Sequence, residues 1–240
     1  MTKSKMYRRL AMATGAALIA STAVVSAAAV SAAATGSAKS TTLVGTFKIT
    51  AGANHTGKPT GTYFRMLEPG QKLNGPDTGY FTNPSSTATD KTYTLLRPGT
   101  AGGLKTGVFQ PAPNPAFDAT GNALASKIIK PQGFAGLNFS IETQNPDAQT
   151  KTAVKAPSIT DASGKLTGNL EALSASWHDL YFNQGSPKPG GAYPSPTTHV
   201  SGTYNSTTHV YTLTWASLIV GGPFNGFTGQ WILTGKFVAS

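Results

Sequence analysis

The C-terminal stretch Phe227-Thr-Gly-Gln-Trp-Ile-Leu-Thr-Gly-Lys-Phe237 decides the fold class. Its odd positions carry two phenylalanines, Trp231 and Leu233, whereas its even positions are mostly polar. Because side chains alternate between the two faces of a strand, this pattern predicts a strand with one buried face. The segments 209–219 and 43–50 alternate in the same way and predict two more strands of this kind.

Short runs rich in threonine, valine, isoleucine and aromatic residues recur along the rest of the chain, separated by clusters of Gly, Pro, Asn, Asp and Ser. This composition is typical of many short strands joined by turns. We expect further strands over 61–68, 91–97, 124–130, 134–143, 166–177 and 198–204. Two hairpins are predicted, with turns at 205–208 and 178–179. The predicted fold is all-β: an antiparallel sandwich, or alternatively a closed or partly open β-barrel.

A recurrent spacing joins glycine and aromatic residues. Glycine stands two residues before an aromatic residue nine times, as in the pair Gly229 and Trp231. Residues two apart in a strand share a face, so the ring can lie over the bare glycine backbone. Glycine also permits the bends that curl a sheet. We interpret the spacing as core packing in a curved sheet; the alternative is a stacking platform for a sugar or another flat ligand.

The first 34 residues have the composition of a secretion signal. Residues 1–9 carry four bases and no acid, and small and apolar residues then continue to about Ala34. A basic head, an apolar middle and a small-residue exit are typical of a signal peptide. We expect cleavage near 28–34, a single all-β domain over 35–240, and an extracellular or cell-envelope location. A retained membrane anchor is the alternative, since the run is long enough to span a bilayer.

The composition excludes several classes of function. The chain has 240 residues, a formal net charge of +10, no cysteine and only 12% charged residues. Without cysteine it has no disulfide framework and no thiol nucleophile. Removal of residues 1–34 lowers the net charge to +6 and leaves scattered bases, so no nucleic-acid partner is predicted. Scattered bases are typical of an ordinary solvated surface; they also allow a weak attraction to an anionic polymer, so the partner we consider is a polysaccharide or envelope polymer.

Three segments carry a resemblance. They are Tyr181-Phe-Asn-Gln-Gly-Ser-Pro-Lys-Pro189, Gly221-Gly-Pro-Phe-Asn-Gly-Phe-Thr-Gly-Gln-Trp231 and, upstream, Phe64-Arg-Met-Leu-Glu-Pro-Gly70. They resemble a group of uncharacterised secreted bacterial proteins, mostly actinobacterial, which implies secretion and a β-rich fold but transfers no functional residue. Strands such as Gln230-Trp-Ile-Leu-Thr234 are also loosely similar to avidin-like barrels. The opening Gly45-Thr-Phe-Lys48 lacks the Trp and Asn of those ligand sites, so this likeness concerns architecture only.

Few residues form a pattern that is typical of a metal site or a catalytic site. The histidines have no zinc-binding spacing, so neither a metal site nor a cofactor is predicted; they are His55, His178, His199 and His209. A glycosidase needs two opposed carboxylates. Glu68, Glu142 and Glu171 lie on predicted strands and are therefore the candidate catalytic residues of a carbohydrate-active hydrolase.

The segment from Tyr181 to Tyr193 combines aromatic, amide and lysine side chains between prolines. Exposed rings beside amides suit carbohydrate stacking and hydrogen bonding. The candidate ligand-binding residues are Trp177, Tyr181, Phe182, Asn183, Gln184 and Tyr193. Because no catalytic motif is present, we expect a non-enzymatic binding, structural or interaction protein whose mature chain does not span a membrane. The alternatives are the hydrolase and a membrane-associated or pore-forming β protein.

Overall fold

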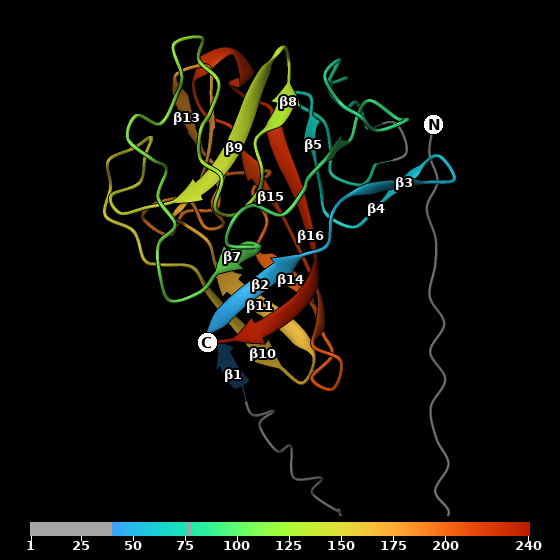
Figure 1. Ribbon diagram of the computed structural model, residues 1–240, viewed down its shortest axis with the longest axis vertical. Helices are drawn as coiled ribbons and strands as arrows, with labels where there is room; N and C mark the ends of the chain where they lie inside the picture. The colour runs from blue at the N-terminus through green and yellow to red at the C-terminus, as the bar shows by residue number, and fades with distance from the viewer. Residues whose placement is uncertain (1–39, 76–77) are drawn as a thin grey trace, which may run out of the picture. The chain divides into compact units, whose positions relative to one another are not determined.

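The computed structural model describes residues 40–75 and 78–240 (Figure 1). These residues form antiparallel β-sheets, and the only helical element among them is the short 3-10 helix η1 (Gly222–Phe224). The prediction of an all-β fold is thereby confirmed. The expected signal segment 1–34 lies outside the described residues.

The largest sheet contains ten strands. They are β1 (Ser40–Leu43), β2 (Gly45–Ile49), β5 (Tyr63–Leu67), β6 (Thr94–Leu95), β7 (Gly103–Lys105), β10 (Ser158–Ala162), β11 (Lys165–Asn169), β14 (Val200–Tyr204), β15 (Val210–Leu218) and β16 (Thr228–Ala239). The main order is β1-β10-β11-β14-β15-β16-β2-β7. Since β1 and β2 stand far apart in this order but are separated along the chain by Val44 alone, the sheet must curl strongly. This curled, barrel-like part is the lower half of the ribbon in Figure 1.

Strand β16, which contains the stretch that opens our sequence analysis, joins the parts of the large sheet. One edge pairs with β15 along its length, while the other pairs first with β5 and then with β2. Its alternating apolar residues Trp231, Leu233 and Phe237 are buried, as predicted. Where β16 meets β2, Gly235 has φ 159°, and a Cβ atom there would lie 1.8 Å from the carbonyl oxygen of Lys48. Only glycine allows this close approach of two backbones.

A second sheet has four strands in the order β13-β12-β9-β8. Their bounds are β8 (Gln132–Phe134), β9 (Leu137–Thr143), β12 (Leu173–Trp177) and β13 (Leu180–Asn183), and a separate hairpin consists of β3 (Ala53–His55) and β4 (Lys58–Thr60). Phe139 and Phe182 of the four-stranded sheet share one hydrophobic cluster with Trp215 and Trp231 of the large sheet. The two sheets therefore pack together over a common core, as in a sandwich, while the large sheet alone is barrel-like.

Both predicted hairpins are confirmed. Strands β14 and β15 pair as far as Tyr204 opposite Tyr211, around the turn 205–208. Strands β12 and β13 pair as far as Trp177 opposite Leu180. The two residues between them have positive φ, 51° at His178 and 59° at Asp179, which is the backbone that a tight two-residue hairpin turn requires.

Other predicted strands are wrong or too long. The segment 166–177 is two strands, β11 and β12, which belong to different sheets and are joined by buried residues 170–172. The segment 124–130 contains no strand and contributes one isolated bridge at Ile129, while 91–97 contains only β6. In the segment 124–130, the buried residues Ile128 and Ile129 belong to a connection, where carbonyls of residues 126–128 accept hydrogen bonds from residues 99–101 and not from a paired strand.

Candidate functional site

The segment that was expected to be a ligand-binding loop begins as a strand, β13, whose alternation divides the candidate residues. Phe182 and Gln184 share one face and, with Trp177 of β12, line a pocket between the two sheets. Phe182 is only 5% exposed and Gln184 only 1% exposed. These three candidates are brought together, but as parts of a pocket wall and not as an exposed stacking surface.

The other three candidates lie elsewhere. Tyr181 and Asn183 belong to the opposite face of β13, because they alternate with Phe182 along the strand. Tyr181 packs against Phe117, with 5.3 Å between ring centroids. Tyr193 is 36% exposed in the loop that follows and lies against the ring of His199, at 3.9 Å between centroids. None of the three lines the pocket.

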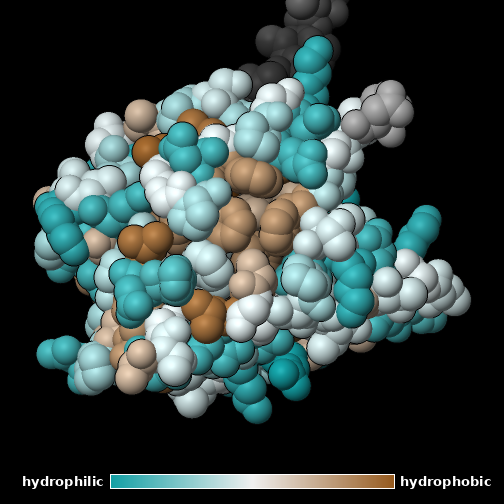
Figure 2. Space-filling model, turned by 90° about the horizontal axis from the view of Figure 1, so that it is seen from above, coloured by the Kyte–Doolittle hydropathy of each residue, from teal (hydrophilic) through white to brown (hydrophobic). Residues whose placement is uncertain are grey.

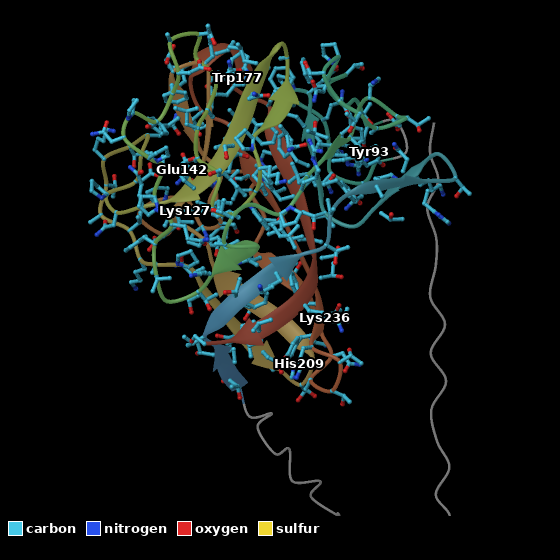
Figure 3. The ribbon with its side chains drawn as sticks, in the orientation of Figure 1. Tyr93, Lys127, Glu142, Trp177, His209 and Lys236 are labelled. Carbon is cyan, nitrogen blue, oxygen red and sulfur yellow. The ribbon has the colours of Figure 1, made fainter. Side chains whose placement is uncertain are left out.

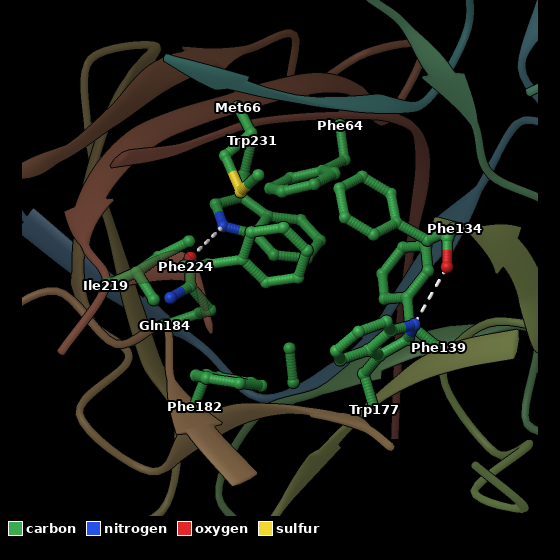
Figure 4. A pocket seen from close by; sticks show the side chains of 11 residues that line it. Phe64, Met66, Phe134, Phe139, Trp177, Phe182, Gln184, Ile219, Phe224 and Trp231 are labelled. Atoms are coloured by element: carbon green, nitrogen blue, oxygen red, sulfur yellow. Dashed lines mark hydrogen bonds between the residues drawn. The ribbon is translucent and has the colours of Figure 1, made fainter. Parts of the chain in front are cut away.

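The pocket is enclosed almost entirely by apolar side chains (Figure 4). Its lining consists of Phe64, Met66, Phe134, Phe139, Ala175, Trp177, Phe182, Gln184, Ile219, Phe224 and Trp231. The lining side chains leave about 380 Å³ that no atom occupies, a figure that includes open solvent and the gaps between atoms, and the cavity itself is small, about 30 Å³. Figure 4 shows Phe182 and Trp177 on one side of this space, facing Met66, Phe64 and Trp231 on the other.

The local sequence explains how the strands supply this lining. On β5, Phe64 and Met66 are two residues apart and therefore face the same way. Ala175 and Trp177 have the same relation on β12, where Ala175 stands opposite Phe182 of β13. The small side chain of Ala175 leaves the central space open, because any larger residue at this position would project into it.

Contacts between rings hold the walls in place. Phe64 lies 4.4 Å from Trp231 and 5.8 Å from Phe134, measured between ring centroids. Trp231 in turn stacks on Trp215 at 5.9 Å with an angle of 9° between the planes. Such tilted and stacked pairs add to the stability that burial alone provides. The walls are thus largely preformed.

The polar atoms of the wall are satisfied within the protein. The indole N–H of Trp231 donates to Gln184 Oε1 at 3.1 Å, and Gln184 Nε2 donates to the carbonyl of Asn183 at 3.0 Å. The indole N–H of Trp177 donates to the carbonyl of Phe134 at 2.8 Å. A ligand inside the pocket therefore meets apolar surface and no free hydrogen-bonding group.

Figure 2 shows the molecule from above, where apolar side chains gather in a hollow surrounded by polar residues. This is the upper end of the molecule, near which Figure 3 labels Trp177. Four half-buried aromatic residues pack at this end, namely Phe81, Trp177, Phe224 and Phe227. An apolar hollow of this kind on a protein surface often marks a binding site.

The three candidate carboxylates are held in different surroundings. Glu68 is exposed directly after β5. Glu171 is mostly buried and accepts the backbone N–H of Lys155 at 2.7 Å. Glu142 lies on β9, where its side chain is fully buried (labelled in Figure 3). No hydrogen bond among the described residues joins any two of these three side chains, and none of them lines the aromatic pocket.

Glu142 has an unusual environment. Its Oε2 accepts the hydroxyl of Ser176 at 3.0 Å, whereas its Oε1 has no partner. Burial raises the pKa of Glu142 from 4.5 to about 8, and the neighbouring Asp147 adds to this increase. The carboxyl group is therefore protonated at neutral pH. It lies on the face of the four-stranded sheet opposite the pocket, as Ser176 alternates with the pocket residue Trp177.

The described residues contain no group of three or more His, Cys, Asp or Glu side chains that could hold a metal ion. They also contain no helix that is both long and apolar enough to cross a membrane.

Comparison with known proteins adds no relative. No family model matches the chain, and no curated protein or solved structure matches it either.

Sequence reasoning missed most of the pocket. Phe64, Phe134, Phe139 and Phe224 come from separate segments, and no motif connects them. The glycine–aromatic spacing was the one available signal, because Phe224 and Trp231 each follow a glycine by two residues. A Cβ atom at Gly229 would lie 2.1 Å from Gln184 Oε1, so this glycine makes room for the amide that Trp231 contacts.

Proposed function

We propose that this protein is a non-enzymatic binding protein that takes up an apolar ligand, or the apolar part of a larger one, in the aromatic pocket. The observation that carries the proposal is an open pocket lined by seven aromatic rings, in which the polar atoms of the wall are already bonded to each other. Water in such a space makes few hydrogen bonds, so its replacement by apolar groups is favourable.

The chemistry of the wall also limits what the ligand is. A sugar ring would bring several hydroxyl groups against surfaces that offer no partner, and each unpaired group costs about 1–3 kcal/mol. The pocket therefore supports an apolar ligand better than a polysaccharide. The hydrolase alternative has no comparable support, since in the described part of the chain no hydrogen bond joins the side chains of Glu68, Glu142 and Glu171 and none of them lines the pocket.

We further propose that the protein acts outside the cytoplasm, in the medium or the cell envelope. The support is the sequence of residues 1–34, with its basic head, apolar middle and small-residue exit. Fractionation of the producing cells, followed by N-terminal sequencing of the protein in the medium, tests this. A chain that is retained in the cytoplasm with residue 1 intact would overturn it.

Binding can be tested with N-phenyl-1-naphthylamine, an uncharged dye that fluoresces in apolar surroundings. We expect saturable binding at one site per chain. Substituting Ala175 by Val, Leu and Phe fills the pocket stepwise, so the affinity should fall with side-chain volume, by at least about tenfold for A175F. The graded series remains informative if the largest substitution impairs folding.

Tyr193→Ala is the matched control, since it removes an exposed ring that lies outside the pocket. Its affinity should equal that of the wild type. Unsaturable dye binding in the wild type, or equal affinity across the Ala175 series, would show that the pocket is not a binding site.

A further inference from the structure

The loop 219–227 connects β15 to β16 and carries an aromatic ring at the mouth of the pocket. The ring of Phe224 lies 5.2 Å from Trp177, 5.6 Å from Phe81 and 5.6 Å from Phe134, between centroids. Two further rings, Phe182 and Phe227, lie at 6.4 and 5.9 Å. A phenyl group supplied by the protein itself therefore occupies a niche formed by five other rings.

The angles in this niche suit an aromatic occupant. The ring of Phe224 meets its five neighbours at 54–86°, which are tilted or edge-to-face arrangements. Because the edge of one aromatic ring is attracted to the face of another, each such pair adds to the stability that the buried area provides. A saturated chain or ring of the same size would gain the burial but not this term.

The loop that carries Phe224 is attached by backbone hydrogen bonds at its base and by Gln149, whose Nε2 donates to the carbonyl of Val220 at 2.7 Å. Gly226 N donates to the carbonyl of Ile219 at 2.9 Å, and Ile219 N donates to that of Phe227 at 2.8 Å. None of the η1 residues is fully buried. Glycines at 221, 222 and 226 have positive φ, and glycine residues of this kind suit a segment that must change its backbone conformation. The residues around Phe224 are thus held mainly by ring contacts and by the bond from Gly221 N to Asn225 Oδ1 at 2.8 Å, and not by pairing with another strand.

We propose that Phe224 is an internal substitute for the ligand, and that the natural ligand carries an uncharged, phenyl-sized aromatic ring that takes its place when the loop 219–227 opens. The polar part of the ligand then stays at the mouth, because the pocket wall offers it no partner. This inference rests on the proposed function and adds to it the class of ligand and the group with which the ligand competes.

The test uses two compounds that differ only in the ring, benzyl alcohol and cyclohexylmethanol. Phe224→Ala removes the competing ring and leaves a vacancy of phenyl size. We expect this variant to bind benzyl alcohol at least about tenfold more tightly than the wild type does, as followed by titration of protein NMR signals. It should also bind benzyl alcohol more tightly than cyclohexylmethanol. Phe224→Leu keeps an apolar side chain and should give a smaller increase in affinity for benzyl alcohol. It replaces F224A in the test if F224A folds poorly.

Tyr193→Ala again provides the control, and its affinity for benzyl alcohol should equal that of the wild type. If the wild type binds the naphthylamine dye but neither Phe224 variant gains affinity for benzyl alcohol, the inference that the ligand competes with Phe224 is wrong. The proposed function would still stand. Equal affinity of F224A for both alcohols would overturn the aromatic class. Absence of dye binding in the wild type, by contrast, would overturn the proposed function itself.

Discussion

Glu142→Gln is expected to stabilise the protein at neutral pH and to leave its stability almost unchanged in mild acid. Glu142 is fully buried, its Oε1 has no partner, and burial together with Asp147 raises its pKa from 4.5 to about 8. Between these two pKa values the unfolded chain releases the proton while the folded protein keeps it. The stability of the wild type therefore falls as the pH rises from 4.5 to about 8. Glutamine carries no titratable proton and removes this dependence.

The magnitude follows from the same two values. A difference of one pH unit in this window changes the free energy of unfolding by about 1.4 kcal/mol. Between pH 5 and pH 7.5 the wild type should thus lose about 3 kcal/mol relative to E142Q. Asp147 does not add a second unpartnered carboxylate, because its two oxygens accept hydrogen bonds from Thr150, Ser174 and Asn183.

Urea unfolding of both proteins at pH 5, 6, 7.5 and 9 measures the effect. The gap in the free energy of unfolding should widen from pH 5 to about 8 and then stay constant. Glu68→Gln removes an exposed carboxyl group and is the control, for which we expect a much smaller gap than for E142Q. A gap for E142Q that is equal at all four pH values, or a variant that is less stable than the wild type at pH 7.5, would refute the reasoning.

Three further outcomes are expected. Burial lowers the pKa of Lys188 from 10.5 to about 7. The free energy of unfolding of the wild type should therefore rise between pH 7 and pH 10.5, because only the unfolded chain still binds the proton there. Lys188→Met should abolish this rise in urea unfolding, and an equal rise in the variant would contradict the prediction. Gly229→Ala places a Cβ atom 2.1 Å from Gln184 Oε1 and should cost about 1–3 kcal/mol in thermal unfolding; a neutral effect would show that Gln184 moves freely. Replacing His178 and Asp179 by Asn and Gly suits the positive φ of both residues and should stabilise the hairpin by about 1 kcal/mol, whereas a lower urea midpoint would speak against this turn.

The features that the sequence predicts correctly are those governed by neighbouring residues. Side-chain alternation identifies the buried face of β16, and the turn residues identify the hairpins at 178–179 and 205–208. Each of these depends on a period of two or on the backbone preference of a few residues. Glycines on strands, such as Gly235, likewise predict the curl of the large sheet.

Local sequence patterns do not reveal that the segment 166–177 forms two strands in different sheets. Leu166 of β11 and Leu173 of β12 are both buried, and so are the residues 170–172 between them. Burial that continues through the connection, Glu171 included, suggests one long strand, although the chain leaves one sheet and enters the other. Only the partners reveal the change, since β11 pairs with β14 and β12 pairs with β9. Pairing over such distances in the sequence is set by the whole fold and not by local pattern.

The pocket shows both the reach and the limit of the alternation rule. On β12 the rule separates Ala175 and Trp177, which line the pocket, from Ser174 and Ser176, which face the buried carboxylates Asp147 and Glu142. One strand thus forms the wall of an apolar site and, on its other face, contacts a carboxyl group whose pKa is raised by burial to about 8.

Ionisation of Glu142 would place a negative charge on the carboxylate that accepts the hydroxyl of Ser176. Ser176 and the pocket residue Trp177 are neighbours on β12, so the carboxyl group and the pocket lie on the two sides of one strand, and this charge would lie behind the pocket wall. Side-chain alternation separates the two faces of β12, but it does not reveal that a buried carboxyl group lies behind the pocket. This arrangement arises only when the loop residue Asp147 and strands β9 and β12 come together, since the energy of a buried charge depends on everything that surrounds it.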